Sequence, residues 1–323
     1  MVHLQVKKSI QLWILTTASC AFAFSVTRRN DSIRLTRRIK YELHRATNPA
    51  GASESTLDDS VRTSSSSATK PERTTSLAHV DYNSVIQAMD GLYLPSEEAM
   101  RNAQSRTDGY WPYVGKNEDP PPGLTYGEFD IAFLAQLLDR AASWKINGAI
   151  SSWQECTFCD IGSGTGRVVI AAAALHPNFK ECRGVEILPK IHSEAVKYLS
   201  KCVLDNKTRR RVLMSSGGRV GDSGSVSAAP PLDLAPVVFR CASATEPCSL
   251  DQVDLAFVFS TCMPAELMGD LSRAVIDQMV PYSLAITIDQ PFPSSVHLEL
   301  LEVVDGSNPL VGGVSRAYLY RVI

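Results

Sequence analysis

Short apolar runs alternate with segments of helical periodicity over most of the chain after residue 80. The runs are four or five residues long and largely apolar, which is typical of strands buried on both faces of a parallel sheet. We expect five such strands, at 157–160, 183–186, 237–240, 255–259 and 284–288. Apolar residues at helical spacing predict helices at 80–92, 129–144, 167–175, 189–202 and 264–279.

Two further runs, 298–304 and 316–322, are separated by a turn region rich in Gly, Asn and Pro, which predicts an antiparallel hairpin. Right-handed crossovers between the earlier strands would place helices on both faces of the sheet. The chain is therefore predicted to be an α/β protein with an open, mostly parallel seven-stranded sheet that ends in this hairpin. The domain is expected at 77–323, with a mobile insert at 206–236, where Arg, Gly, Ser and Pro accumulate.

The first 76 residues have a different composition. Residues 1–24 contain Lys7-Lys8, an apolar run at 10–15 and then small residues, a pattern typical of a signal peptide. Residues 25–76 are rich first in Arg and then in Ser and Thr, which predicts a transit-like segment and a disordered linker. Together they resemble the bipartite plastid presequence of algae with secondary plastids, which predicts a plastid location. Two alternatives remain open: a buried helix in place of the signal peptide, and a basic DNA-binding or nuclear arm that would place the protein in the nucleus.

Composition and charge narrow the range of functions. With 44% hydrophobic and 20% charged residues, the 323-residue chain has the composition of a soluble globular protein. No apolar run approaches the roughly 20 residues that span a bilayer. Residues 1–50 carry 9 basic and 2 acidic residues, which leaves 23 basic against 32 acidic residues, a net charge of −9, for the rest. An acidic body does not favour direct binding of a nucleic acid backbone.

Cys156 and Cys159 form the only C-x-x-C motif among the eight cysteines. A redox pair or part of a zinc site is one interpretation. However, residues three apart on a strand face opposite sides at a separation of about 10 Å, beyond the reach of a disulfide. We therefore expect structural cysteines in a reducing compartment, and no metal site.

A glycine-rich turn follows the first predicted strand and opens a predicted helix, with the sequence Asp160-Ile161-Gly162-Ser163-Gly164-Thr165-Gly166. A dinucleotide-binding fingerprint would need glycine at position 167, which is Arg167. The spacing favours S-adenosylmethionine, which has no pyrophosphate and whose ammonium group can interact with Asp160. Glu186 ends the second predicted strand, where its carboxylate can accept hydrogen bonds from both ribose hydroxyls. A glycine turn with a purely structural role is the alternative.

Several motifs resemble, in order and spacing, those of the non-SET histone-lysine methyltransferases of the disruptor-of-telomeric-silencing type. They are Thr125-Tyr126-Gly127-Glu128, the helix from Phe129, the glycine turn and Gly184-Val185-Glu186. The resemblance implies the Rossmann-like fold of class I S-adenosylmethionine-dependent methyltransferases. It also implies methyl transfer to a lysine of a histone or another protein, with the nucleosome as the family's substrate. Tyr126 and Glu128 would bind the cofactor; a helix N-cap turn is the alternative.

The candidate cofactor-binding residues come from this loop, from the glycine turn and from the ends of the second and third predicted strands. They are Tyr126, Glu128, Asp160, Gly162, Ser163, Gly164, Gly166, Glu186, Ala242 and Ser243.

Two segments depart from the family pattern. Phe259-Ser260 stands where the family has an Asn pair that lines the lysine channel, and residues 240–243 stand where it has an acid and an aromatic residue that hold adenine. Methyl transfer gains chiefly from proximity and orientation, so we expect Ser260, at the end of the fourth strand, to face the methyl group as the catalytic residue. We also expect a monomer. The alternatives are a methyltransferase for a plastid protein or a small molecule, a cofactor-binding module without turnover and, least favoured, a dehydrogenase.

Overall fold

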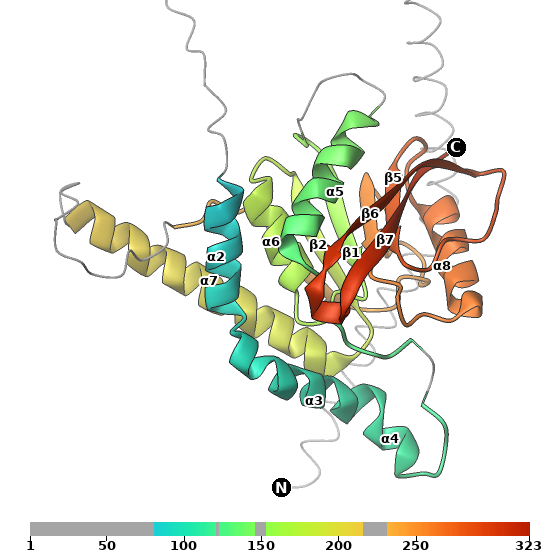
Figure 1. Cartoon of the computed structure of the whole chain (residues 1–323), viewed down its shortest axis with the longest axis horizontal. Helices are drawn as coiled ribbons and strands as arrows, with labels where there is room; N and C mark the ends of the chain where they lie inside the picture. The colour runs from blue at the N-terminus through green and yellow to red at the C-terminus, as the bar shows by residue number, and fades with distance from the viewer. Residues whose placement is uncertain (1–80, 121–122, 146–152, 216–230) are drawn as a thin grey trace, which may run out of the picture. The chain divides into compact units, whose positions relative to one another are not determined.

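The computed structural model describes residues 81–120, 123–145, 153–215 and 231–323 (Figure 1). The chain divides into two units, Met1–Ser76 and Leu77–Ile323, and every described residue belongs to the second. The predicted signal-peptide-like segment at 1–24, the predicted linker at 25–76 and residues 216–230 of the predicted insert lie outside the described residues. Among the helices that the structure describes, none is both long and apolar enough to cross a membrane.

Seven strands form one sheet in the order β3-β2-β1-β4-β5-β7-β6. Their bounds are β1 Thr157–Ile161, β2 Glu181–Glu186, β3 Val237–Cys241, β4 Leu255–Val258, β5 Leu284–Ile288, β6 Leu298–Asn308 and β7 Gly313–Val322. Strands β1 to β5 pair in parallel, whereas β7 runs antiparallel to both β5 and β6. This topology is that of the Rossmann-like methyltransferase fold, which confirms the predicted fold class and its C-terminal hairpin. The chain changes its direction of strand addition between β1 and β4, and open α/β sheets bind ligands beside such a point, at the carboxyl ends of the strands.

Helices cover both faces of the sheet. Their bounds are α2 Tyr82–Leu92, η1 Pro95–Glu97, α3 Glu98–Gly109, α4 Trp111–Val114, α5 Ile131–Ser143, α6 Arg167–Leu175, α7 Pro189–Ser215 and α8 Ala265–Gln278. Figure 1 shows α2, α5, α6 and α7 together on one side of the sheet and α8 on the other. The layers are therefore helix, sheet and helix.

The largest differences from the predicted helices concern α3 and α7. The apolar pattern does not predict α3, because the buried face of this helix consists of Arg101, Ser105 and Gly109. The helix predicted to end at residue 202 continues to Ser215 as α7, so residues 206–215 of the predicted insert are helical. No Gly or Pro occurs between Pro189 and Ser215. The absence of helix-breaking residues over this range is consistent with a helix longer than the apolar pattern predicts.

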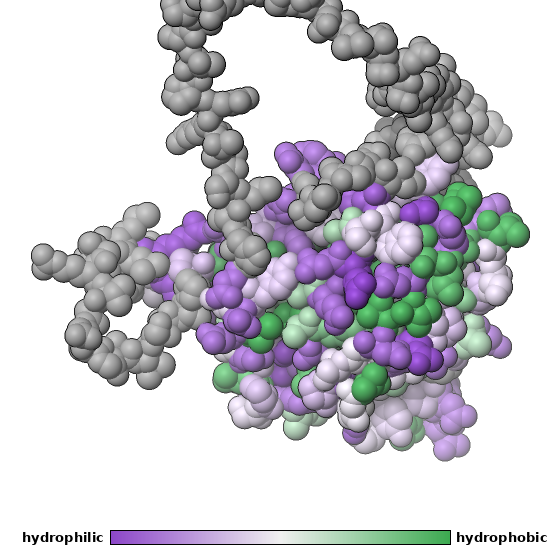
Figure 2. Space-filling model, turned by 45° about the horizontal axis from the view of Figure 1, so that its top comes forward, coloured by the Kyte–Doolittle hydropathy of each residue, from purple (hydrophilic) through white to green (hydrophobic). Residues whose placement is uncertain are grey.

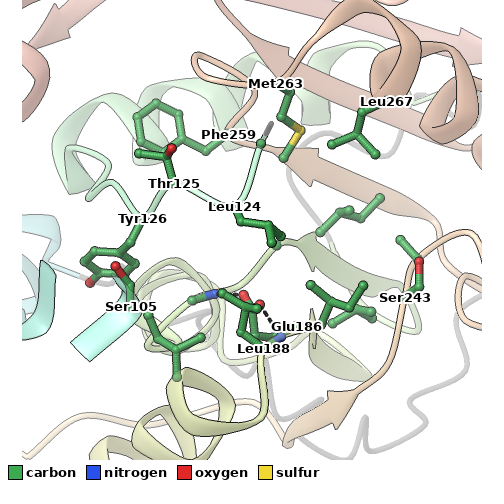
Figure 3. A pocket seen from close by; sticks show the side chains of 18 of the residues that line it. Ser105, Leu124, Thr125, Tyr126, Glu186, Leu188, Ser243, Phe259, Met263 and Leu267 are labelled. Carbon is green, nitrogen blue, oxygen red and sulfur yellow. Dashed lines mark hydrogen bonds between the residues drawn. The ribbon is translucent and has the colours of Figure 1, made fainter. Parts of the chain in front are cut away.

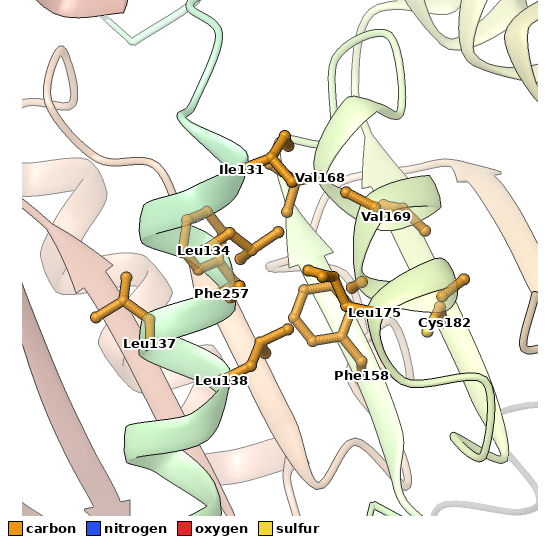
Figure 4. Close-up of a cluster of buried hydrophobic side chains, with 14 of the residues drawn as sticks. Ile131, Leu134, Leu137, Leu138, Phe158, Val168, Val169, Leu175, Cys182 and Phe257 are labelled. Carbon is orange, nitrogen blue, oxygen red and sulfur yellow. The ribbon is translucent and has the colours of Figure 1, made fainter. Parts of the chain in front are cut away.

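The sheet separates two hydrophobic cores. Phe158 and Phe257 point toward α5 and α6, where they pack with Leu134 and Leu175 (Figure 4). Because successive strand residues face opposite sides, Cys159 belongs to the second core, beneath α8. On the face shown in Figure 2, hydrophilic side chains surround smaller hydrophobic areas.

Cys156 and Cys159 are both free thiols, in different environments. Cys159 is fully buried, and burial raises its pKa to about 12. Cys156 is half-buried, and its sulfur accepts a hydrogen bond of 3.1 Å from Lys145 Nζ. The two thiols do not form a disulfide with each other.

Candidate functional site

The glycine turn leaves the carboxyl end of β1 and leads directly into α6. Gly162, Gly164 and Gly166 all have positive φ, at 77°, 52° and 81°. This region of backbone conformation is open to glycine and costly for most other residues. The amides of Gly162 and Ser163 donate to the Val185 carbonyl of β2, at 2.8 and 3.1 Å. The three glycines therefore let the chain curl back onto the neighbouring strand.

Glu186, the last residue of β2, fixes the other side of the turn. Its Oε2 accepts a hydrogen bond of 2.8 Å from the Gly164 amide, and its Oε1 accepts one of 2.8 Å from the Leu188 amide. The residue is buried, and burial raises the pKa of its carboxyl although the amide donors act to lower it. Each carboxylate oxygen retains a second lone-pair direction, so the group can accept further hydrogen bonds from a ligand that carries hydroxyls.

Residues 123–128, which we call the roof loop, lie over the glycine turn. A Cβ placed on Gly164 would be 2.8 Å from Cε2 of Tyr126, so the Tyr126 ring rests directly against the turn. The Tyr126 hydroxyl donates to Glu128 Oε1 at 2.9 Å and lies 2.8 Å from Thr165 Oγ1. Burial, together with the nearby Glu128 carboxylate, raises the pKa of Tyr126. The roof loop is thus tied to the turn by both a ring contact and hydrogen bonds.

The roof loop, the glycine turn and the loops after β2, β3 and β4 enclose a cavity of about 890 Å³, counted with its open mouth. Figure 3 shows Glu186 and Leu188 on one side of the cavity and Phe259, Met263 and Leu267 across from them. One end is therefore polar, around the turn and Glu186, and the other is apolar.

Asp160, the residue before the end of β1, is buried behind this cavity. Its exposed fraction is 3%. Burial, and secondarily the charge of Glu186, raises its pKa well above the ordinary value. Burying a charged carboxylate beside a second one is unfavourable, so the site carries an electrostatic cost that a cation could offset.

We expect Asp160→Asn to stabilise the ligand-free protein. Because the folded protein holds the Asp160 proton more tightly than the unfolded chain does, the free energy of unfolding falls as pH rises from the ordinary pKa toward the raised one. Below the ordinary pKa both states are protonated and this loss is absent. Melting temperatures at pH 5 and pH 8 should show that Asp160→Asn gains more at pH 8.

Asp277→Asn, at an exposed position on α8, is the matched control for this comparison. An equal gain of Asp160→Asn at the two pH values, or a gain no different from the control, would contradict the electrostatic account of Asp160.

Part of the predicted cofactor-binding set lines the cavity: Tyr126, Gly162, Gly164, Glu186, Ala242 and Ser243. The remaining predicted residues lie behind this lining. Glu128 and Ser163 are buried like Asp160, and Gly166 forms the N-cap of α6. Glu128 pairs with Arg101 and Arg167. Glu128, Asp160, Ser163 and Gly166 are therefore close to the turn and the roof loop but are not part of the cavity lining.

Ser260 does not face the cavity. The residue is fully buried, and its hydroxyl donates to the carbonyls of Ile288 and Gln290, at 2.6 and 3.1 Å. The hydroxyl also accepts from the Ile288 amide at 3.1 Å. The structure therefore corrects the expectation that Ser260 faces the transferred methyl group, because its hydrogen bonds join the loop after β4 to the end of β5.

Sequence reasoning missed several cavity residues. Apolar side chains from α7, from α8 and from the loops before them contribute to the lining, and α3 contributes a serine; these residues are Ser105, Leu188, Ile191, Met263, Leu267 and Leu271. Leu188 and Met263 each follow shortly after the end of a parallel strand, a position that could have marked them as site residues.

Solved structures that are similar to this chain include several methyltransferases. An RNA methyltransferase from Salinibacter ruber, solved in complex with S-adenosyl-L-homocysteine, is 18% identical over 58% of this chain and 90% of its own, with a TM-score of 0.35. The rRNA methyltransferase aviRa from Streptomyces viridochromogenes is 15% identical over 67% of this chain and 92% of its own, with a TM-score of 0.44. Magnesium protoporphyrin IX methyltransferase from Synechocystis PCC 6803, with bound S-adenosylmethionine, is 14% identical over 76% and 99%, with a TM-score of 0.37. At these identities the likeness concerns the fold alone. No protein-family model and no curated protein sequence matches the chain.

Proposed function

We propose that the protein is an S-adenosylmethionine-dependent methyltransferase. The observation that carries this proposal is the meeting of the glycine turn, Glu186 and Tyr126 in one cavity, at the carboxyl ends of β1 and β2. When bound, S-adenosylmethionine supplies a methyl group on a positively charged sulfur, which a nucleophilic acceptor can take.

The described residues fit this cofactor part by part. Glu186 offers carboxylate oxygens to the ribose hydroxyls, and Asp160, buried behind the lining, contributes an acidic group near the turn that favours the positively charged cofactor. Ile187 and Ala242, at the ends of β2 and β3, offer apolar surface to the adenine ring. Gly164 has no side chain, so the cofactor can come close to the backbone of the turn. A side chain at this position would collide with Tyr126. The cavity lining thus offers partners for the ribose and for the adenine ring.

The chain contributes to methyl transfer mainly through orientation. Among the described residues that line the cavity, the ionisable side chains are those of Tyr126 and Glu186, and both are hydrogen-bonded within the site. Holding the two reactants in line can by itself lower the activation barrier substantially, without any proton transfer by the protein. The acceptor must then arrive in a form that already has a free lone pair.

We further propose a protein lysine as the acceptor. Phe259, Met263 and Leu267 form an apolar side of the cavity, which suits the methylene stem of a lysine. Apolar surroundings disfavour the charged ammonium and lower the pKa of the amine, so the neutral, nucleophilic form becomes more accessible. The resemblance of the sequence motifs to histone-lysine methyltransferases makes histone lysines the first candidates. A plastid protein or a small apolar molecule is the alternative.

The direct test is a transfer assay with the full chain, methyl-labelled S-adenosylmethionine and three acceptor preparations: nucleosomes, free core histones and a plastid protein extract. We expect label on a lysine of one preparation with the unmodified chain and much less label with Glu186→Gln at a cofactor concentration that does not saturate the variant. Cofactor binding with no label on any protein would overturn the lysine proposal and favour a small-molecule acceptor. A lack of cofactor binding would overturn the methyltransferase proposal itself.

Leu267→Asp is expected to shift the pH dependence of methyl transfer upward. Leu267 is half-buried on the apolar side of the cavity, and its Cδ2 lies where a side chain on Gly123 would point. A carboxylate there would stabilise the incoming ammonium and raise the pKa of the amine by about one unit. The pH of half-maximal rate should rise by a similar amount.

Leu267→Asn has nearly the same shape and no charge, so its pH profile should match that of the unmodified chain even if its rate differs. Identical pH profiles for Leu267→Asp and Leu267→Asn would show that an amine does not approach this side of the cavity.

A further inference from the structure

A buried cluster of charged and aromatic residues lies behind the roof loop. Arg101 of α3 has an exposed fraction of 1%, and its Nε is 2.5 Å from Oε1 of Glu128. Arg167, the first residue of α6, approaches Oε2 of the same carboxylate with its Nη1 at 3.3 Å. Two guanidinium groups from different helices therefore hold one buried carboxylate.

Inside the protein, the two arginines carry two positive charges against the single negative charge of Glu128. Glu128 is the buried carboxylate between the two arginines, and Asp90 approaches Arg167 at 3.6 Å from a largely exposed position. Breaking a buried ion pair by removing one partner is strongly unfavourable, because the other charge remains in a medium of low polarity. The carboxylate of Glu128 is accordingly fixed in place.

Glu128 transmits this fixation to the cavity through Tyr126. The Tyr126 hydroxyl donates to Glu128 Oε1, and the same hydroxyl lies within hydrogen-bond distance of Thr165 in the glycine turn. The Tyr126 ring lies against Gly164 and lines the cavity. A short chain of contacts thus runs from α3 to the cavity wall.

Tyr93, which follows α2, adds a second connection. Its hydroxyl donates to the Thr165 carbonyl at 2.8 Å, and the guanidinium carbons of Arg101 and Arg167 both lie 5.7 Å from the centre of its ring. Cation–π contacts at this distance are attractive, more so away from water. The N-terminal helices therefore touch the glycine turn through Tyr93 as well as through Glu128.

We propose that Arg101 and Arg167 are positioning residues that, through Glu128, hold Tyr126 against the glycine turn and so make α3 part of the cofactor site. The inference rests on the proposed function for the identity of the ligand. The effect of the arginines on the glycine turn can be measured without a ligand, because the contacts that produce it are present in the ligand-free protein.

Arg101→Met in the full chain tests this role, because methionine keeps an apolar stem of similar length and removes the guanidinium. We expect the dissociation constant for S-adenosylmethionine to rise by roughly tenfold or more, as for the loss of a hydrogen bond to a charged group. In the ligand-free protein, the hydrogen-bonded amides of Gly162, Ser163, Gly164 and Gly166 should exchange faster with solvent. Arg101→Lys keeps the charge without the planar fork and should give a smaller change in both measurements.

Arg183→Met is the matched control. Arg183 is also buried and also pairs with a carboxylate, that of Glu181 on the same strand, but none of its hydrogen bonds reaches the roof loop or the turn. We expect Arg183→Met to lower the melting temperature and to leave both the dissociation constant and the exchange of the turn amides nearly unchanged.

Tyr126→Phe carries the test if Arg101→Met does not fold, because it removes only the hydroxyl and should accelerate the exchange of the turn amides. The proposal is overturned if Tyr126→Phe, or a folded Arg101→Met, matches Arg183→Met in cofactor affinity and in exchange of the turn. If the unmodified chain does not bind S-adenosylmethionine, the proposed function fails, whereas amide exchange in the ligand-free protein still decides the positioning role.

Discussion

Gly164→Ala is expected to weaken the binding of S-adenosylmethionine by about 100-fold or more. A residue with a side chain at the φ of 52° found here costs roughly 1–2 kcal/mol in backbone energy. The added methyl group would also stand 2.8 Å from Cε2 of Tyr126, closer than two carbons can approach, so the ring must move away from the turn. Strain in the turn and displacement of the ring act on the same wall of the cavity. Isothermal titration of the variant with the cofactor measures the loss.

Gly91→Ala is the control for this substitution. Gly91 lies in α2, and no atom is within 4 Å of the position that its Cβ would occupy. Alanine there should stabilise the protein by about 0.5–1 kcal/mol, since glycine in a helix carries an entropic cost. Cofactor affinity should not change. Unaltered affinity in Gly164→Ala as well would contradict the placement of the cofactor against the turn.

Glu186→Gln is expected to weaken cofactor binding by about 10- to 100-fold with little change in shape. The glutamine oxygen can replace only one of the two carboxylate acceptors, and its amide group would face a backbone N–H of either Gly164 or Leu188. A buried donor left without an acceptor costs roughly 1–3 kcal/mol. The substitution also removes an acceptor from the ribose hydroxyls.

Glu181→Gln, at the other end of the same strand, is the control because Glu181 pairs with Arg183 away from the cavity. Its cofactor affinity should equal that of the unmodified chain. Equal affinities for Glu186→Gln and Glu181→Gln would show that Glu186 does not hold the cofactor.

The segment from β1 to α6 could be predicted from the sequence because its determinants are local. The apolar run, the spacing of the glycines and the following helix-forming residues all lie within 157–175, and α6 has the predicted bounds. The last parallel strand, β5, likewise matches its prediction at 284–288, since it is a short apolar run between turn residues. Strand β6 extends past its predicted end, because Gly306 and its neighbours have the composition of a turn yet continue the pairing with β7.

The arginine cluster and the orientation of Ser260 could not be predicted, because each depends on contacts between distant parts of the chain. Arg101 lies on a helix with no apolar stripe, and its partner Glu128 is 27 residues away. The sequence predicts correctly that Ser260 follows β4. Its side chain turns toward β5 because its hydroxyl hydrogen-bonds to the backbone of Ile288, 28 residues further on. Local pattern gives the position of such residues along the chain, and only packing decides which way they face.

The central claim is that the cavity between the roof loop and the glycine turn binds S-adenosylmethionine. Its most direct test is an equilibrium titration of the full chain with S-adenosylmethionine, S-adenosylhomocysteine and a nicotinamide dinucleotide. The account predicts saturable binding of the first two at one site per chain, lost or strongly weakened in Gly164→Ala, and no binding of the dinucleotide. Binding of the dinucleotide without binding of either S-adenosyl compound would contradict it.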